Sequence, residues 1–226
     1  MKNFTDKTSD TISEAAKERL LQLLRLMEKH TAAGEAAPVT SAQVEELTGW
    51  SRDTIRKDIS FLSAVAGSAI GGNSGYAPEI LVPLIKKALG LDCRRKFCVM
   101  GLGRLGSACL NFVPMDLNEF ELAAGFDINV NRVEILSSPV PLYPVYKMAE
   151  VVSRFGIEIA LLCVPAEAAQ AAAEKCAASG IRGILNFAPA VLNVPPEIIV
   201  QNIYATDELR SLAIKIFKRS HYEKSI

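Results

Sequence analysis

Apolar residues follow two different rhythms along this chain. Up to about residue 90 they recur every three or four positions, which predicts helices interrupted by one small Gly-rich segment. From about residue 94, short apolar runs alternate with helix-like stretches, a pattern typical of a parallel α/β sheet. The expected strands cover residues 96–100, 122–127, 157–164, 183–187 and 198–203. The expected helices of this second region cover residues 105–113, 145–155, 166–179 and 207–218.

A glycine-rich turn, Gly101–Gly106, follows the first expected strand and precedes a helix. Its three glycines permit a tight bend, a close approach of backbone to phosphate, and close packing of the helix on the strand. The next strand ends at Asp127, about twenty residues further on, where a carboxylate accepts hydrogen bonds from an adenosine ribose. These features predict an NAD(H) site and disfavour the 2′-phosphate of NADP, although Arg132 nearby weakens that exclusion. The expected cofactor contacts are Gly101, Gly103, Arg104, Leu105, Gly106, Asp127, Ile128 and Arg132.

Three helices are expected near the N-terminus. The first covers Ser13–His30, and the second begins at Thr40, which has capping-box spacing to Gln43, and ends at Gly49. A third helix, capped by Ser51, follows at once and exposes cations and hydroxyls, which predicts a helix-turn-helix. The candidate DNA contacts are Ser51, Arg52, Thr54, Arg56, Lys57 and Ser60.

The Gly-rich segment 67–76 would form the hairpin wing of a winged helix. It carries no cation, and the first 90 residues contain as many acidic as basic side chains. A solvated, charged helix surface therefore explains the third helix as well as DNA binding does. The fold expected overall is α/β: a mainly α winged-helix domain over 1–90, a Rossmann-like doubly wound parallel sheet over 91–204, and a C-terminal helix and tail over 205–226.

Composition narrows the classes of function. The formal net charge of the 226 residues is zero, so no overall field attracts a polyanion. No apolar run approaches the roughly 20 residues that span a bilayer, and the polar N-terminus lacks a signal-peptide core, which predicts a cytoplasmic protein without a membrane partner. The five cysteines are scattered, and Cys98 and Cys163 lie in strand-like runs, which favours core thiols over a metal site.

Several stretches of the chain resemble the Rex family of redox-sensing transcriptional repressors. They are Ile55–Asp58, Gly75–Tyr76, the glycine motif, Phe126–Asp127, Val164–Gln170, Gly180–Pro189 and Leu192–Pro195. The resemblance covers most of the chain and implies a homodimer that binds double-stranded operator DNA and is released when NADH replaces NAD. It also implies that two strand-end loops border the nicotinamide. The cofactor contacts implied in this way are Val164, Pro165, Ala166, Asn186, Ala188 and Pro189.

The chain departs from the family pattern at the wing and after the last strand. The family's wing usually carries a cation, and its absence predicts weaker or altered operator binding. The family has an Asp where this chain has Tyr204, and that Asp contributes to contacts between protomers in which an arginine like Arg19 is one partner. Tyr204 supplies no carboxylate. The cofactor site is therefore expected to be intact and the switch to be altered.

The C-terminal helix carries an apolar stripe that includes Leu209, Leu212 and Ile216. In the family this helix is exchanged between protomers, so the resemblance implies that these residues contact the partner of a homodimer. The alternative is a stripe that packs on its own core.

A dehydrogenase is the alternative for the Rossmann segment. Hydride transfer usually needs an acid or base near the nicotinamide, and neither His30 nor His221 follows a strand of that segment. Tyr143 and Lys147 have the Tyr-x-x-x-Lys spacing of short-chain dehydrogenases, but Pro144 biases Tyr143 towards an extended conformation. We therefore expect no catalytic residue and no enzymatic activity. A Rex-like DNA-binding protein with an altered or lost redox switch is a third interpretation.

Overall fold

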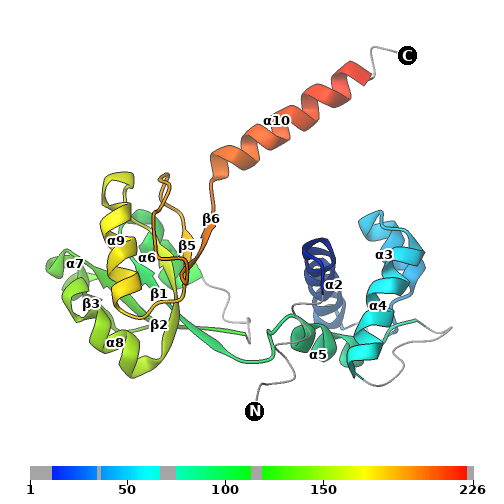
Figure 1. The fold of residues 1–226 in the computed structure, drawn as a ribbon, viewed down its shortest axis with the longest axis horizontal. Coiled ribbons are helices and arrows are strands. Elements are labelled where there is room, and N and C mark those ends of the chain that lie inside the picture. The colour runs from blue at the N-terminus through cyan, green and yellow to red at the C-terminus, as the bar shows by residue number, and fades with distance from the viewer. Residues whose placement is uncertain (1–11, 35–36, 67–74, 113–118, 223–226) are drawn as a thin grey trace. The chain divides into compact units, whose positions relative to one another are not determined.

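The computed structural model describes residues 12–34, 37–66, 75–112 and 119–222 (Figure 1). The chain divides between Cys93 and Arg94 into two compact units. The expected wing at residues 67–74 and the end of the expected helix at Val113 lie outside the described residues.

Four helices build the described part of the N-terminal unit. They are α2 (Glu14–Ala32), α3 (Ser41–Thr48), α4 (Arg52–Ala66) and α5 (Pro78–Ala88). Ser13 caps α2, and Thr40 and Gln43 form the predicted capping box of α3, a feature that stabilises a helix by about 1 kcal/mol. Gly49 ends α3 in the left-handed conformation at φ 74°, so that α4 begins only a few residues later. The predicted starts of these three helices are confirmed.

The core of this unit is formed by the inner faces of its helices. On the inner face of α4, Ile55, Ile59 and Leu62 are each at most 2% exposed and pack with residues such as Met27 and Leu81 of the other helices. These three buried positions fix the rotation of α4, so that the face with Arg52, Arg56 and Lys57 is exposed to solvent.

The second unit is a six-stranded parallel sheet with the order β3-β2-β1-β4-β5-β6. Its strands are β1 (Arg95–Met100), β2 (Phe120–Asp127), β3 (Leu142–Pro144), β4 (Ile157–Leu162), β5 (Gly183–Asn186) and β6 (Ile199–Asn202). This is the doubly wound order, and it confirms the predicted Rossmann-like sheet. Strand β3, which the sequence analysis missed, has three residues and includes Pro144 at the edge of the sheet, where a missing N–H is tolerated.

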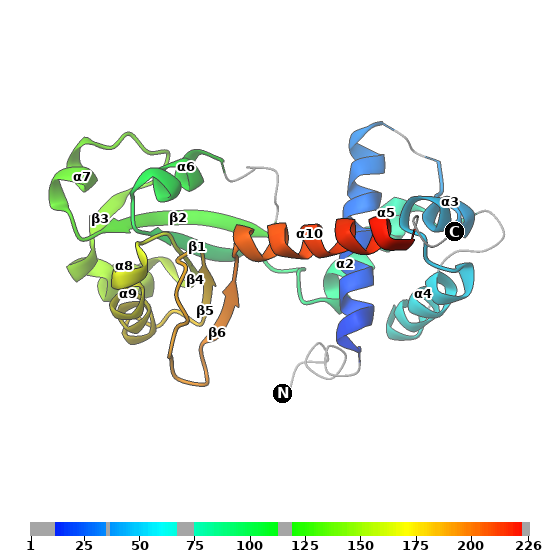
Figure 2. The ribbon, with the colours of Figure 1, turned by 90° about the horizontal axis from the view of Figure 1, so that it is seen from above.

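Helices cover the sheet in two layers, which Figure 2 shows on its opposite sides. Helices α6 and α7 pack on one face, and α8 and α9, with the short 3-10 helix η1, lie on the other. Their bounds are Arg104–Phe112 for α6, Val130–Ile135 for α7, Val145–Lys147 for η1, Met148–Phe155 for α8 and Ala166–Ala178 for α9. Side chains alternate along β1, so that Val99 belongs to the α6 core and Cys98 and Met100 to the α9 core.

Helix α10 (Ala205–Tyr222) continues from β6 as the last element. It is longer than the predicted 207–218. Its apolar side chains Leu209, Leu212 and Ile216 are 65%, 53% and 58% exposed. These exposures do not support the alternative of a stripe that packs on its own core.

Candidate functional site

A crevice at the carboxyl ends of β1, β2 and β4 brings much of the predicted cofactor site together. It encloses a cavity of about 390 Å³. Of the predicted contacts, the cavity is lined by Gly101, Gly103, Asp127, Ile128, Arg132, Val164 and Pro165. This is the place in a doubly wound sheet, next to the switch in strand order, where ligands bind.

At two of the three glycine positions of the motif, a Cβ atom would collide with neighbouring backbone. Gly101 has φ 92°, and a Cβ there would come within 2.7 Å of the Cys163 carbonyl oxygen. A Cβ on Gly106 would collide with the Gly101 carbonyl oxygen, so the third glycine lets α6 pack against the turn. Around Gly103, in contrast, the space is open. The turn therefore leaves its backbone accessible from the crevice, at the N-terminus of α6, which is where a pyrophosphate binds.

Asp127 ends β2 and points its carboxylate at the glycine turn. Oδ2 accepts hydrogen bonds from the Leu102 N–H at 2.7 Å and from the Arg132 guanidinium at 3.0 Å, and Oδ1 accepts one from the Asn129 N–H at 2.8 Å. Burial raises the pKa of this carboxyl, but the Asn129, Leu102 and Arg132 donors outweigh burial and lower the pKa overall. A carboxylate has about four acceptor positions, so Asp127 can still accept from a ribose hydroxyl while it stays ionised.

The far wall of the crevice is provided by the loop after β4 and by α9. Val164 and Pro165 line it, and Pro165 lies just before the first turn of α9. Several further residues line the crevice that were not predicted from the sequence, namely Met100, Val145, Cys163, Ala168, Ala171, Ala172 and Lys175. Ala168, Ala171 and Lys175 recur at helical spacing on α9, and this periodicity after a strand-end loop is the signal that could have found them.

The remaining predicted contacts do not line this cavity. Arg104 and Leu105 are exposed in the first turn of α6, Ala166 is exposed at the start of α9, and Pro189 is exposed after β5. Asn186 and Ala188 are buried, and the Ala188 N–H donates to Asn186 Oδ1 at 3.0 Å. The Phe187 N–H donates to the Leu162 carbonyl at 3.0 Å, which holds this loop beside the end of β4.

The predicted DNA contacts lie on the outer face of α4. Arg52, Arg56, Lys57 and Ser60 are exposed, and Thr54 is half-buried. Ser51 is exposed, and its hydroxyl accepts from the Thr54 N–H at 3.3 Å, as expected of a capping residue.

A polar cavity of about 380 Å³ lies beside this face of α4. Arg52 and Arg56 line it together with Thr40, Ser41 and Tyr76 and with Ala42 and Gly75. The Ser41 and Tyr76 hydroxyls lie 3.0 Å apart. The Arg52 guanidinium also donates to Glu45 at 2.7 Å in an exposed ion pair, which is weak in water. The contribution of Thr40, Ser41 and Tyr76 was not predicted, because the Val39–Tyr76 bridge and the Ser41–Tyr76 contact join residues that are distant along the chain.

Arg19 is engaged within its own unit. Its guanidinium donates to both carboxylate oxygens of Asp58 on α4, at 2.7 and 2.8 Å. This hydrogen bonding raises the pKa of Arg19. A bidentate pair of this kind is directional, so it fixes α4 against α2 as well as neutralising charge.

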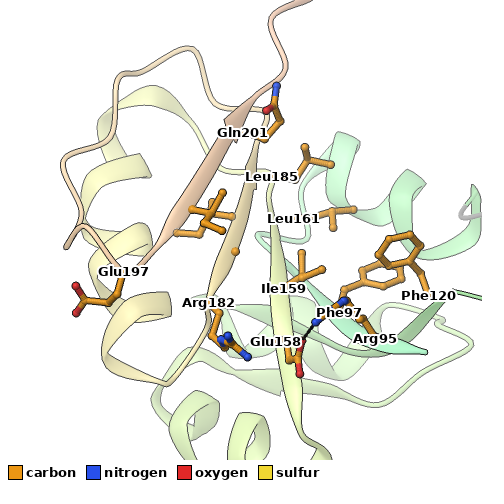
Figure 3. A pocket seen from close by; sticks show the side chains of 13 residues that line it. Arg95, Phe97, Phe120, Glu158, Ile159, Leu161, Arg182, Leu185, Glu197 and Gln201 are labelled. Atoms are coloured by element: carbon orange, nitrogen blue, oxygen red, sulfur yellow. Dashed lines mark hydrogen bonds and ion pairs between the residues drawn. The ribbon is translucent and has the colours of Figure 1, made fainter. Parts of the chain in front are cut away.

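The sheet face that carries α6 and α7 is left uncovered over β4, β5 and β6. A cavity of about 650 Å³ lies there, with an apolar floor that includes Phe97, Phe120, Leu161 and Leu185 (Figure 3). At its edge the Arg95 guanidinium donates to Glu158 at 2.6 Å. This cavity is larger than the crevice, but it lies away from the glycine turn, so we do not assign the cofactor to it.

Other chemistry is sparse in the part of the chain that the structure describes. It contains no cluster of three or more His, Cys, Asp or Glu side chains placed to hold a metal ion, and no helix long and apolar enough to cross a membrane. All five cysteines are free, and burial raises the pKa of Cys176 to about 12. Tyr143 lies in β3 rather than on a helix with Lys147, as Pro144 predicted, and its ring packs between Phe126 and Phe155.

These features define a class: proteins that join a helix-turn-helix unit to a Rossmann domain with a glycine-lined crevice. The model of the CoA binding domain family matches residues 92–190, which include the crevice. The redox-sensing transcriptional repressor Rex of Bacillus licheniformis is 34% identical over 94% of this chain and 97% of its own length, and that of Thermus thermophilus is 38% identical over 85% and 88%. The chain belongs to the Rex family.

Solved structures agree with this assignment. The structure of RSP, a Rex-family repressor, has a TM-score of 0.77 at 28% identity, and the match covers 94% of this chain and 97% of RSP. RSP in complex with β-NADH has a TM-score of 0.78 at 28% identity, over 96% and 99% of the two chains. RSP in complex with β-NAD⁺ and operator DNA also has a TM-score of 0.78, at 27% identity over 94% and 96%. These relatives are named as transcriptional repressors and not as enzymes.

Proposed function

We propose that this chain is a redox-sensing transcriptional repressor, which binds operator DNA as a homodimer and is released by NADH. The observation that carries the proposal is the crevice, where the glycine turn and the ionised Asp127 face one cavity in a chain that also exposes a cationic recognition helix. Because a repressor acts on the chromosome, we also propose that the protein is cytoplasmic.

The cofactor lies with its pyrophosphate at the N-terminus of α6 and its adenosine ribose at Asp127. Open space around Gly103 and the open acceptor position of Asp127 fit this placement. Arg132 shares Oδ2 of Asp127 and is 44% exposed, so it can move aside for the ribose. The nicotinamide side extends past Pro165 and Ala166 towards the loop after β5. The remaining contacts in this proposal are Arg104, Leu105, Gly106, Ile128, Val164, Asn186, Ala188 and Pro189.

Operator DNA binds across α4, with its base edges read from the exposed N-terminal turns of the helix. Arg52 and Arg56 line the polar cavity beside Ser41, so a backbone phosphate there would receive two guanidinium groups and a hydroxyl. Lys57 adds a further exposed cation. The surface ion pairs of Arg52 and Arg56 with Glu45 and Asp53 cost little to exchange for a phosphate.

The homodimer forms when α10 of each protomer covers the open sheet face of the other. An 18-residue helix is about 27 Å long, whereas the four strands β1, β4, β5 and β6 span about 15 Å, so α10 reaches across the face. Both surfaces are apolar: Leu212 and Phe217 on the helix are more than half exposed, and Leu161 and Leu185 line the cavity of Figure 3. When the helix packs on the sheet face, both apolar surfaces are removed from water.

NADH releases DNA because it binds two arrangements of the dimer with different affinities. NADH binds an arrangement of the dimer in which the two recognition helices no longer match the half-site spacing of the operator, and it shifts the population towards that arrangement. A decisive shift needs about 5 kcal/mol of differential binding.

A fluorescence polarisation titration tests the proposal. A labelled Rex-type palindromic duplex is titrated with the full-length protein without nucleotide, with NAD and with NADH. We expect binding that NADH abolishes and NAD preserves. Lys57→Ala should weaken binding without nucleotide and lower the salt slope by about 1, whereas Lys29→Ala, which removes an exposed cation from α2, should not.

One observation favours a second candidate, a Rex-like repressor with an altered switch. Arg19 is bound in a bidentate pair by Asp58 of its own protomer, and Tyr204 stands at the position of its expected partner carboxylate. The same titration decides between the two candidates: tight operator binding that neither nucleotide changes identifies the altered switch.

A further inference from the structure

The hydroxyl of Tyr204 enters a hydrogen-bond network centred on the buried side chain of Asn186. It donates to the Ala190 carbonyl at 2.8 Å and lies 3.1 Å from Asn202 Oδ1. Asn186 Nδ2 donates to the same two acceptors, each at 2.9 Å, and lies 3.5 Å from the Tyr204 hydroxyl. Tyr204 thus shares both of its acceptors with a residue of the loop assigned to the nicotinamide side.

A count of protons shows what the hydroxyl adds. The Asn186 amide has two hydrogens, one for Ala190 and one for Asn202, and the Tyr204 hydroxyl has one more. Without this hydroxyl both acceptors would keep a donor, so no buried polar atom would be orphaned. The hydroxyl therefore acts as a tie between Tyr204 and the loop, and it is not the sole donor to either acceptor.

The main chain of Tyr204 holds the start of α10. Its carbonyl accepts the N–H of Asp207 at 2.9 Å and of Glu208 at 3.3 Å, which are the first hydrogen bonds of the helix. The preceding residue, Ile203, donates its N–H to the Asn186 carbonyl at 2.9 Å. One residue therefore contacts the loop through its side chain and α10 through its backbone.

The loop continues this connection into the crevice. Asn186 pairs with Leu162 in the register of β5 and β4, and the Phe187 N–H donates to the Leu162 carbonyl. Cys163, the first residue after β4, lines the crevice. Hydrogen bonds therefore link the Asn186–Ala190 loop to Tyr204 on one side and to the strand end that borders the crevice on the other.

We propose that Tyr204 is a positioning residue that transmits nicotinamide binding from the Asn186–Ala190 loop to the orientation of α10. Because α10 is the element that we assign to the partner subunit's surface, its orientation sets the geometry of the dimer. This inference rests on the proposed function. In this proposal Tyr204 couples nicotinamide binding to the dimer by hydrogen bonding to the loop of its own chain. In the family pattern, a carboxylate at this position contributes instead to contacts between protomers, with an arginine like Arg19 as one partner.

The test is Tyr204→Phe, which keeps the ring and removes the hydroxyl. The readout is the coupling ratio, defined as the operator Kd at saturating NADH divided by the operator Kd without nucleotide. We expect Tyr204→Phe to lower this ratio about three- to tenfold, the effect of one net hydrogen bond, with NADH binding retained. Tyr146→Phe, which removes a hydroxyl from a tyrosine that is 72% exposed on η1, should leave the ratio unchanged.

Hydrogen exchange distinguishes a tyrosine that transmits NADH binding from one that has only a structural role. In the wild type, NADH should change deuterium uptake in the first turn of α10, at Asp207 and Glu208. In Tyr204→Phe that NADH-dependent change should be lost, whereas a structural role would alter uptake equally with and without NADH. Equal coupling ratios and equal uptake changes in the two proteins would overturn the inference. A wild type whose operator affinity ignores NADH would instead overturn the proposed function.

Discussion

At the scale of single residues, half of the side chains and glycines that line the crevice could be predicted from the sequence. The glycine spacing and Asp127 are local signals, because a tight turn and a strand-end carboxylate depend on neighbouring residues. The structure places both where the pattern predicts, with Gly101 at φ 92° and Asp127 buried. The hydrogen bonds of Tyr204 to Asn186 and Ala190 could not be predicted in this way, since they join residues that are distant along the chain.

Asp127 provides a prediction about affinity. Asp127→Asn keeps the shape of the side chain and removes the charge that a ribose hydroxyl meets. We expect NADH affinity to fall by about ten- to a hundredfold, the range for a hydrogen bond to a charged group. A titration followed by NADH fluorescence measures this affinity. The control is Glu134→Gln on α7, which removes an exposed carboxylate and should leave NADH affinity unchanged. Unchanged affinity in Asp127→Asn would remove this residue from the site.

The lowered pKa of Asp127 also predicts how stability depends on pH. Burial alone would raise the pKa above 3.8, but the Asn129, Leu102 and Arg132 donors bring it below that value. Near pH 3.8 the unfolded chain therefore binds more protons at this group, so the stabilising contribution is present above about pH 4 and is lost as pH falls through the folded pKa. Urea unfolding of wild type and Asp127→Asn should show a stability difference that shrinks below pH 4. A difference that grows there would contradict the assignment.

At the scale of elements, capping and periodicity predicted most helices and strands. The capping box of α3 and the left-handed Gly49 fix the short turn before α4, and both are visible in the sequence. Strand β3 and helix α7 were missed because three and six residues are too few to establish a period. The open sheet face was also missed, because it follows from the crossover connections and not from any one segment.

Helix α10 carries a prediction about assembly. Leu212→Asp places a carboxylate on the stripe that we assign to the interface, where it would be buried without a partner. We expect the dimer to dissociate in sedimentation velocity at concentrations where the wild type is dimeric. Lys215→Asp adds a carboxylate three residues away, at an exposed position on the polar side of the helix, and should leave the dimer intact. A Leu212→Asp protein that sediments like the wild type would exclude α10 from the interface.

At the scale of the whole molecule, function depends on a coupling between two units. The crevice belongs to the unit that begins at Arg94, and α4 belongs to the unit that ends at Cys93. A response of DNA affinity to NADH therefore requires a free energy of coupling between sites on different units. No local sequence pattern reports that quantity, because it is a difference between two arrangements of the dimer.

Thermodynamic linkage gives the most direct test of this coupling. If NADH weakens operator binding by a given factor, the operator must weaken NADH binding by the same factor. The measurement is calorimetric titration of NADH into the full-length dimer, with and without saturating operator duplex. We predict an NADH affinity that the operator lowers by the factor seen in the polarisation titration. An NADH affinity that is identical with and without operator would contradict the proposal that this protein is a redox switch.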